Sequence, residues 1–139
     1  MGSSEVRFFK LNYEAVINEL REYAKKALEK GALSVILVGS LARGDYTAFS
    51  DADIIIIVEE SSERPMDRIA KFMETKTSVD VDVRVYTLEE IENMMGCGSR
   101  IIHEIAEYGI ILGGKQEIIR RIKKAIKQKS PKKLFKNKL

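Results

Sequence analysis

Two short runs of branched apolar residues constrain the fold of this chain more than any other feature of its sequence. Residues 35–38 read Val-Ile-Leu-Val, and residues 54–58 read Ile-Ile-Ile-Ile-Val. Uninterrupted runs of this kind are typical of strands that are covered on both faces, as in parallel or mixed sheets between helices. The first run stops at Gly39-Ser40 and the second begins after Asp51-Ala52-Asp53. We therefore expect an α/β domain in which a turn and two carboxylates border buried strands.

The rest of the chain supplies the other elements of such a domain. Val79, Val81, Val83 and Val85 alternate with polar residues, which predicts a third strand over residues 78–86. A fourth, short strand is expected over residues 110–112. Helical spacing of apolar residues, with capping and stop signals, predicts helices over residues 11–30, 66–74, 87–95, 99–108 and 116–129. The expected architecture is a mixed sheet of four to five strands flanked by helices.

Four signals set the expected ends of these helices. Asn12 is a plausible N-cap and Gly31 a plausible stop for the first helix. Thr87 and Glu90 have the spacing of a capping box at the start of the helix over residues 87–95. Ser130-Pro131 is expected to end the last helix.

The polar residues beside the two apolar runs are candidates for binding a metal ion and phosphate. In a strand, residues i and i+2 share a face, so Asp51 and Asp53 would lie on the same side. Neighbouring carboxylates repel one another, and a divalent cation such as Mg²⁺ relieves that repulsion. Gly39 lets the backbone approach a ligand closely, and a helical turn over residues 40–43 would direct free N–H groups at phosphate. A phosphate site would then face a metal site.

The third predicted strand adds two more acids. Asp80 and Asp82 lie on its polar face together with Arg84. Alternation of this kind is also typical of a half-exposed strand whose acids are simply solvated. From the pattern alone either carboxylate, or neither, belongs to the site.

The order of these residues resembles a known signature. Gly39-Ser40, Arg43-Gly44 and Ser50-Asp51-Ala52-Asp53, with ten residues between Ser40 and Asp51, resemble the motif of the polymerase-beta-type nucleotidyltransferases. The form GSLARGDYTAFSDAD is similar to that of the minimal nucleotidyltransferases, small single-domain proteins often paired with a helical HEPN-domain protein. The resemblance extends from the first helix to the strand near Ile110.

The resemblance implies a polymerase-beta-like fold and a set of roles. Asp51, Asp53 and Asp82 would be the catalytic carboxylates and would hold two Mg²⁺ ions, with Asp80 as the alternative third acid. ATP or another nucleoside triphosphate would be the substrate.

Other residues of the motif would bind the nucleotide. Gly39, Ser40 and Arg43 would contact its phosphates, and Ser50 would lie beside them or order the loop. The reaction would move a nucleoside monophosphate onto an acceptor hydroxyl. The acceptor implied by the resemblance is a tyrosine of a HEPN-type toxin partner, which gives an antitoxin role. The alternatives are a binding subunit that masks a partner with little or no catalysis, and a small RNA- or antibiotic-modifying enzyme.

The length and the charge distribution of the chain indicate how it is organised. With 139 residues we expect one nucleotidyltransferase domain over residues 1–129 and a basic, flexible tail over residues 130–139. Residues 115–139 carry a net charge of +10 and the rest of the chain −7, so the basic end is a candidate contact for nucleic acid or an acidic partner. A homodimer or a heteromer is possible for so small a domain.

The sequence also bears on localisation. The first residues lack a charged-then-apolar signal pattern, and no run of about eighteen apolar residues occurs, which predicts a cytoplasmic protein without a membrane contact. Cys97 is the only cysteine, which excludes an internal disulfide and a cysteine metal cluster.

Overall fold

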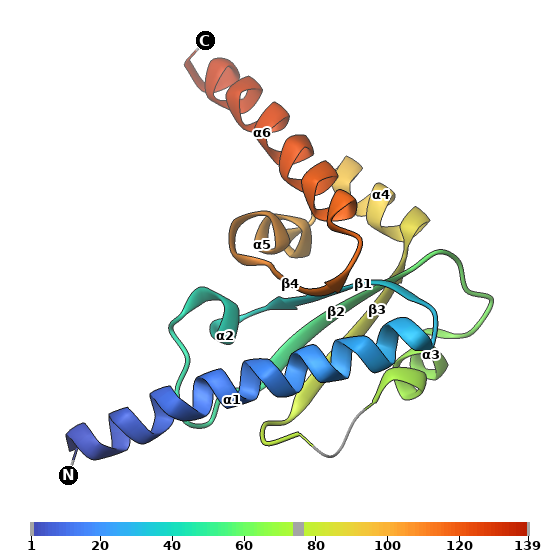
Figure 1. Cartoon of the computed structure of the whole chain (residues 1–139). Helices are drawn as coiled ribbons and strands as arrows, with labels where there is room; N and C mark the ends of the chain where they lie inside the picture. Colours follow the sequence, from blue (N-terminus) through green and yellow to red (C-terminus); the bar gives the residue numbers. More distant parts are fainter. Residues whose placement is uncertain (1, 74–76, 139) are drawn as a thin grey trace.

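The structure is a computed structural model that describes the backbone of residues 2–73 and 77–138, and the side chains of residues 13–73 and 77–127. Helices and strands alternate along most of the chain (Figure 1). In order, the elements are α1 (Gly2–Glu29), β1 (Ala32–Val38), α2 (Ser40–Arg43), β2 (Ala52–Val58), α3 (Pro65–Phe72), β3 (Val81–Thr87), α4 (Leu88–Cys97), α5 (Arg100–Tyr108), β4 (Ile110–Gly114) and α6 (Gln116–Lys138).

The strands of the described residues form one four-stranded mixed sheet in the order β3-β2-β1-β4. β1 pairs antiparallel with β2 and β4, whereas β2 pairs parallel with β3. The two apolar runs therefore form the central strands, where both faces are covered. The expected α/β fold with a mixed sheet flanked by helices is confirmed.

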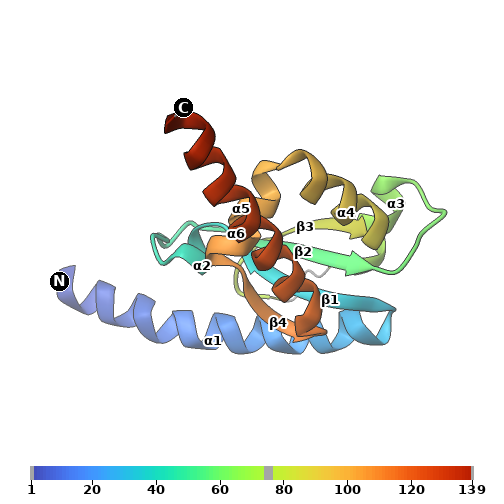
Figure 2. The ribbon, with the colours of Figure 1, turned by 90° about the horizontal axis from the view of Figure 1, so that it is seen from above.

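Each face of the sheet has its own apolar core. Ile54 and Ile56 of β2 pack in the cluster that contains the buried residues of α1 and Phe72 of α3. Ile55 and Ile57 face the opposite way, into the cluster built with α4, α5 and α6. α1 accordingly lies along one face of the sheet, and α4, α5 and α6 lie over the other (Figure 1 and Figure 2).

The strand register brings three polar segments to one end of the sheet. Because β1 and β2 are antiparallel, Val38 at the end of β1 is the partner of Asp53 at the start of β2. Because β2 and β3 are parallel, Asp53 is also opposite Asp82 at the start of β3. The Gly39-Ser40 turn and both carboxylates thus meet where the central strands begin or end.

Two predicted helix ends are wrong, and both helices are longer than expected. α1 begins at Gly2, so Asn12 lies inside the helix and does not cap it. Residues 3–11 contain neither glycine nor proline, so nothing in them stops the helix from extending toward the N-terminus. α6 continues through Ser130 and Pro131 to Lys138, since a proline removes one backbone donor while helix formers flank it. The division at residue 130 into a domain and a tail stays a prediction.

Other local signals are confirmed. Gly31 follows α1 with a positive φ of 109°, the backbone conformation that glycine favours at a helix end. Thr87 and Glu90 form the expected capping box at the start of α4. Among the helices of the described residues, none is both long enough and apolar enough to cross a membrane.

Candidate active site

A cavity of about 240 Å³ opens at the end of the sheet where Val38, Asp53 and Asp82 meet. It lies on the side of the sheet that carries α5. Its lining consists of a few apolar residues and a larger polar set: Val38, Gly39, Ser40, Arg43, Asp53, Ile54, Ile55, Asp82, Arg84, Ile101 and Glu104. Most of the residues that were predicted from the sequence to bind phosphate or metal thus line one cavity.

Two carboxylates face this cavity from neighbouring strands. Asp53 is half-buried and Asp82 is exposed, and the two are register partners in the parallel pair β2–β3. Burial raises the pKa of Asp53, and the negative charge of Asp82 raises it further, while Arg84 opposes the shift. Asp51 and Glu104 add smaller contributions in the same direction as Asp82. The fold therefore concentrates negative charge at a place where Asp53 resists ionisation.

The structure distinguishes between the two acids of β3. Asp82 lines the cavity, whereas Asp80 precedes the strand and is exposed. The backbone of Asp80 has a pairing role, since its carbonyl accepts a hydrogen bond of 2.8 Å from the Ala52 N–H. Asp51 is exposed just before β2 and is not part of the cavity lining, although its charge acts on Asp53.

Gly39 is the point of closest approach between β1 and the acids. Its φ is +77°, and a Cβ atom added to it would overlap Oδ2 of Asp53. Only glycine combines that conformation with the lack of a side chain. The Gly39 N–H group donates a hydrogen bond of 3.0 Å to Oε1 of Glu104, so this backbone donor is directed at the cavity.

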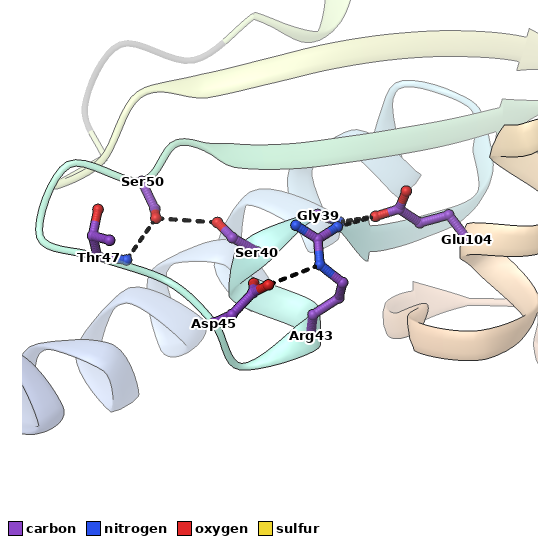
Figure 3. A network of polar contacts seen from close by, with 7 residues as sticks. All are labelled: Gly39, Ser40, Arg43, Asp45, Thr47, Ser50 and Glu104. Carbon is purple, nitrogen blue, oxygen red and sulfur yellow. Dashed lines mark hydrogen bonds and ion pairs between the residues drawn. The ribbon is translucent and has the colours of Figure 1, made fainter.

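The turn after Gly39 holds the loop that leads to β2. The Gly39 carbonyl accepts from the N–H groups of Ala42 and Arg43, which closes the short helix α2. The Ser40 hydroxyl lies 3.1 Å from the Ser50 hydroxyl, which in turn accepts a hydrogen bond of 2.8 Å from the Thr47 N–H (Figure 3). Ser40 lines the cavity and Ser50 does not, so Ser50 orders the loop.

Arg43 extends from α2 toward α5. Its Nη1 atom donates to Oε1 of Glu104 at 2.6 Å, and its Nε donates to Oδ2 of Asp45 at 3.3 Å (Figure 3). The hydrogen bond to Asp45, followed by the negative charges of Asp45 and Glu104, raises the pKa of Arg43. A permanently charged guanidinium thus lies at the cavity next to the Gly39 N–H.

Sequence reasoning missed Glu104 as a site residue and treated Arg84 only as a polar residue on the third strand. Both line the cavity, and Glu104 contacts Gly39 and Arg43 from 65 and 61 positions along the chain. The only signal for Glu104 was an acid beside the apolar face of a predicted helix. That signal is weak, because most such acids are solvated.

The donor set suits a magnesium ion that is completed by its substrate. Within the residues that the structure describes, no three His, Cys, Asp or Glu side chains gather closely enough to form a metal site alone. Mg²⁺ commonly uses one or two carboxylates and takes its other ligands from water and substrate phosphates. Asp53 and Asp82, adjacent and mutually repelling, fit that pattern.

Comparison with known proteins places the chain in a family. Residues 17–112 match the nucleotidyltransferase domain family. The chain is similar to a candidate nucleotidyltransferase from Sulfolobus solfataricus, with 18% identity, a TM-score of 0.54, and coverage of 75% of this chain and 85% of that chain. At this identity the likeness shows a shared fold.

Two further solved structures have lower TM-scores. A chain of a toxin–antitoxin crystallised with AMP-PNP is 16% identical, with a TM-score of 0.49 and coverage of 85% of this chain and 90% of that chain. A chain of a mutant toxin–antitoxin MntA–HpeT is 15% identical, with a TM-score of 0.48 and coverage of 88% and 90%. No sequence among curated proteins matches the chain.

Proposed function

The chain belongs to the nucleotidyltransferase domain family, and on this basis we propose that it transfers a nucleoside monophosphate, AMP from ATP, to an acceptor hydroxyl in a Mg²⁺-dependent reaction. The observation that carries the proposal is the juxtaposition in one cavity of the Asp53–Asp82 pair with the Gly39 N–H and Arg43. The same cavity thus holds carboxylates suited to a metal ion and donors suited to phosphate.

Asp51, Asp53 and Asp82 would hold two Mg²⁺ ions between β2, β3 and the triphosphate. The ions would supply Lewis-acid activation of the attacking oxygen and neutralisation of the phosphate charge. Asp53 and Asp82 present their carboxylates from adjacent strands, and the lack of a side chain at Gly39 leaves room for the carboxylate of Asp53. Asp51 lies just before β2, outside the cavity lining, and its charge acts on Asp53.

Three other residues of the cavity would bind the phosphates. Gly39 offers a backbone N–H, Ser40 a hydroxyl and Arg43 a guanidinium, which together are suited to phosphate oxygens. Ser50 would keep Ser40 in place through their hydroxyl contact. A triphosphate held there would present its α-phosphorus toward Asp53 and Asp82.

The reaction is a substitution at the α-phosphorus. A bond forms between the acceptor oxygen and this phosphorus, the bond from the phosphorus to the pyrophosphate oxygen breaks, and pyrophosphate leaves. The hydroxyl proton passes to the carboxylate of Asp82, the more exposed acid of the pair. Arg43 and the Gly39 N–H stabilise the charge on the departing phosphates.

We propose a protein acceptor supplied by another chain. The strands of the described residues form a single sheet, and the cavity of about 240 Å³ is lined by the residues proposed here for metal and phosphate. A tyrosine on a HEPN-type partner, with an antitoxin role in the cytoplasm, is the acceptor implied by the motif of Gly39-Ser40 and Asp51-Ala52-Asp53. This part of the proposal rests on the motif resemblance alone.

The test is transfer of label from α-³²P-ATP to a co-purified partner, with Mg²⁺ and with EDTA. Asp53→Asn and Asp82→Asn should lower the rate by more than about 100-fold, beyond the effect typical of outer-shell partners of a metal. Asp80→Asn is the matched control, because it removes the same charge two residues before Asp82, outside the cavity lining. It should retain most of the activity.

Two results would contradict the proposal. Equal loss in the Asp80 and Asp82 variants would mean that the register pair has no special role. Tight binding of a partner without any labelling, unchanged in all variants, would indicate a subunit that masks its partner without modifying it.

A further inference from the structure

Glu104 occupies the two donors that face the proposed phosphate site. A single oxygen, Oε1, accepts the Gly39 N–H at 3.0 Å and the Arg43 guanidinium at 2.6 Å (Figure 3). The Glu104 side chain is only 24% exposed, so the carboxylate lies within the cavity mouth and not in free solvent. An anionic oxygen therefore already lies where a phosphate oxygen would have to bind.

We propose that Glu104 is a specificity-determining residue that competes with phosphate for Gly39 and Arg43, so that nucleotide enters the site efficiently only together with a cation. The inference rests on the proposed function, because it concerns the same site. It assigns a role to a side chain on α5 that takes no part in the transfer itself.

The competition follows from the chemistry of the donors. A carboxylate oxygen and a phosphate oxygen are alternative anionic acceptors, and both cannot approach the same N–H without strong repulsion. The Gly39 backbone is fixed, since its carbonyl accepts from the Ala42 and Arg43 N–H groups and the preceding Val38 is paired with Asp53. The α5 backbone is equally fixed, because Ile102 and Ile105 are fully buried. The Glu104 side chain is therefore the part that moves.

The charges of the cavity explain the link to a cation. Its lining contains three acids, Asp53, Asp82 and Glu104, and two bases, Arg43 and Arg84. The excess of negative charge opposes a bare polyphosphate. A divalent cation held by Asp53 and Asp82 would reverse the sign of the net charge of the lining, and the Glu104 side chain would then be free to leave Arg43. A neutral side chain at position 104 would remove most of the need for a cation when polyphosphate binds.

Binding of pyrophosphate, which lacks a base and needs no acceptor, tests the inference directly. Calorimetric titrations would compare the wild-type protein with Glu104→Gln and Glu104→Ala, each in EDTA and in Mg²⁺. Both variants should bind pyrophosphate in EDTA roughly tenfold more tightly than the wild type, the size expected from removing one like-charge repulsion at a half-exposed site. In Mg²⁺ the difference should shrink to a few-fold.

Glu107→Gln is the matched control. It removes one carboxylate from the same helix, three residues further on, at a position that does not line this cavity. It should change pyrophosphate affinity less than twofold. Thermal melts of all variants would establish that each is folded under the conditions of the titration.

Three outcomes would overturn the inference. Pyrophosphate binding that is unchanged or weaker in folded Glu104 variants would mean that Glu104 serves only to hold Arg43 in place. An equal gain in Glu107→Gln would reduce the effect to net charge. No binding in either Glu104 variant would show that the released donors do not take phosphate.

Failure of the proposed function has a different readout. Tighter pyrophosphate binding in the Glu104 variants without any label transfer from ATP would leave the inference standing and contradict the transferase activity. Label transfer without a gain in pyrophosphate affinity would do the reverse.

Discussion

At Gly39 the absence of one side-chain atom allows a strand end and a carboxylate to lie together. The residue has a φ of +77°, and a Cβ would overlap Oδ2 of Asp53. The same residue donates its N–H toward the proposed phosphate site. The backbone conformation at the end of β1 and the placement of Asp53 therefore both depend on this one position.

Gly39→Ala should lower nucleotidyl transfer by roughly 100-fold, the effect of misplacing a reacting group by about 1 Å. The added Cβ would push Asp53 away from Asp82, and the left-handed backbone would cost about 1–2 kcal/mol of stability. Steady-state label transfer and thermal denaturation measure the two effects separately.

Gly31→Ala is the control for this prediction. Gly31 has a φ of +109°, yet nothing lies within 4 Å of an added Cβ. The Gly31→Ala variant should lose a comparable amount of stability and keep its activity. Equal loss of activity in both variants would attribute the effect to backbone strain and not to Asp53.

At the scale of single elements, α4 shows how local bonds join the two layers around β3. The Thr87 hydroxyl accepts the Glu90 N–H at 3.1 Å, and the Glu90 carboxylate accepts the Thr87 N–H at 2.8 Å. Arg68 of α3 donates to the same carboxylate at 2.7 Å. A helix start on one face of the sheet is thereby tied to a helix on the other.

Thr87→Ala should destabilise the protein by about 1 kcal/mol, the usual cost of losing an N-cap side chain. Ser99→Ala should cost less, because Ser99 occupies the N-cap position of α5 without a side-chain capping bond. Urea denaturation followed by circular dichroism would compare them. A larger loss for Ser99→Ala would contradict the importance given to the cap of α4.

Glu90→Gln should destabilise the protein in a pH-dependent way. Burial alone would raise the pKa of Glu90, but the hydrogen bonds from Thr87 and Arg68 lower it below the ordinary value of 4.5. A lowered carboxyl pKa in the folded state stabilises the fold above the ordinary value, and that stability is lost as the pH falls through the lowered one.

Thermal melts of the Glu90 variant between pH 7 and pH 3 test this sign. The difference in Tm from the wild type should be constant above about pH 5, since both folded and unfolded carboxylates are then ionised. This difference in Tm should become smaller as the pH falls further. Glu89→Gln, in the same helical turn but without these bonds, should show no such narrowing, and a gap that widens toward low pH would contradict the assignment.

At the scale of the whole molecule, the sheet separates two apolar cores. The site lies at one end of the sheet, on the face that carries α5. α1 and α3 cover one face, while α4, α5 and α6 cover the other (Figure 1). Ile118, Ile119 and Ile122 anchor α6, all within its first two turns. The later part of α6 extends away from the sheet in both views (Figure 1 and Figure 2).

Removal of residues 130–139 should therefore leave the domain intact. The deletion takes away four lysines and no acid, which changes the net charge from +3 to −1. Tm should stay within about 2 °C of the full chain, as for changes at the surface that spare the core. A fall of ten degrees or more would mean that these residues belong to the domain, against the predicted division at residue 130.

Much of the fold was predictable because the signals are local. The runs at residues 35–38 and 54–58 marked the central strands, since only strands covered on both faces require continuous branched apolar residues. Gly31 and the Thr87–Glu90 pair marked helix ends, since their preferences act within one turn. The missed ends of α1 and α6 show the limit of such rules, because a weak stop signal does not halt a helix that can continue.

By itself, then, the sequence determined which segments form the strands and most of the helices, and it supplied a set of candidate residues of which most line one cavity. The choice between Asp82 and Asp80 needed the parallel register of β2 and β3, which pairs Asp53 with Asp82. The contact of Glu104 with Gly39 joins residues 65 positions apart. Only tertiary packing brings such residues together, since hydrophobic patterns place a residue on a face of its element and do not select its neighbour across the fold.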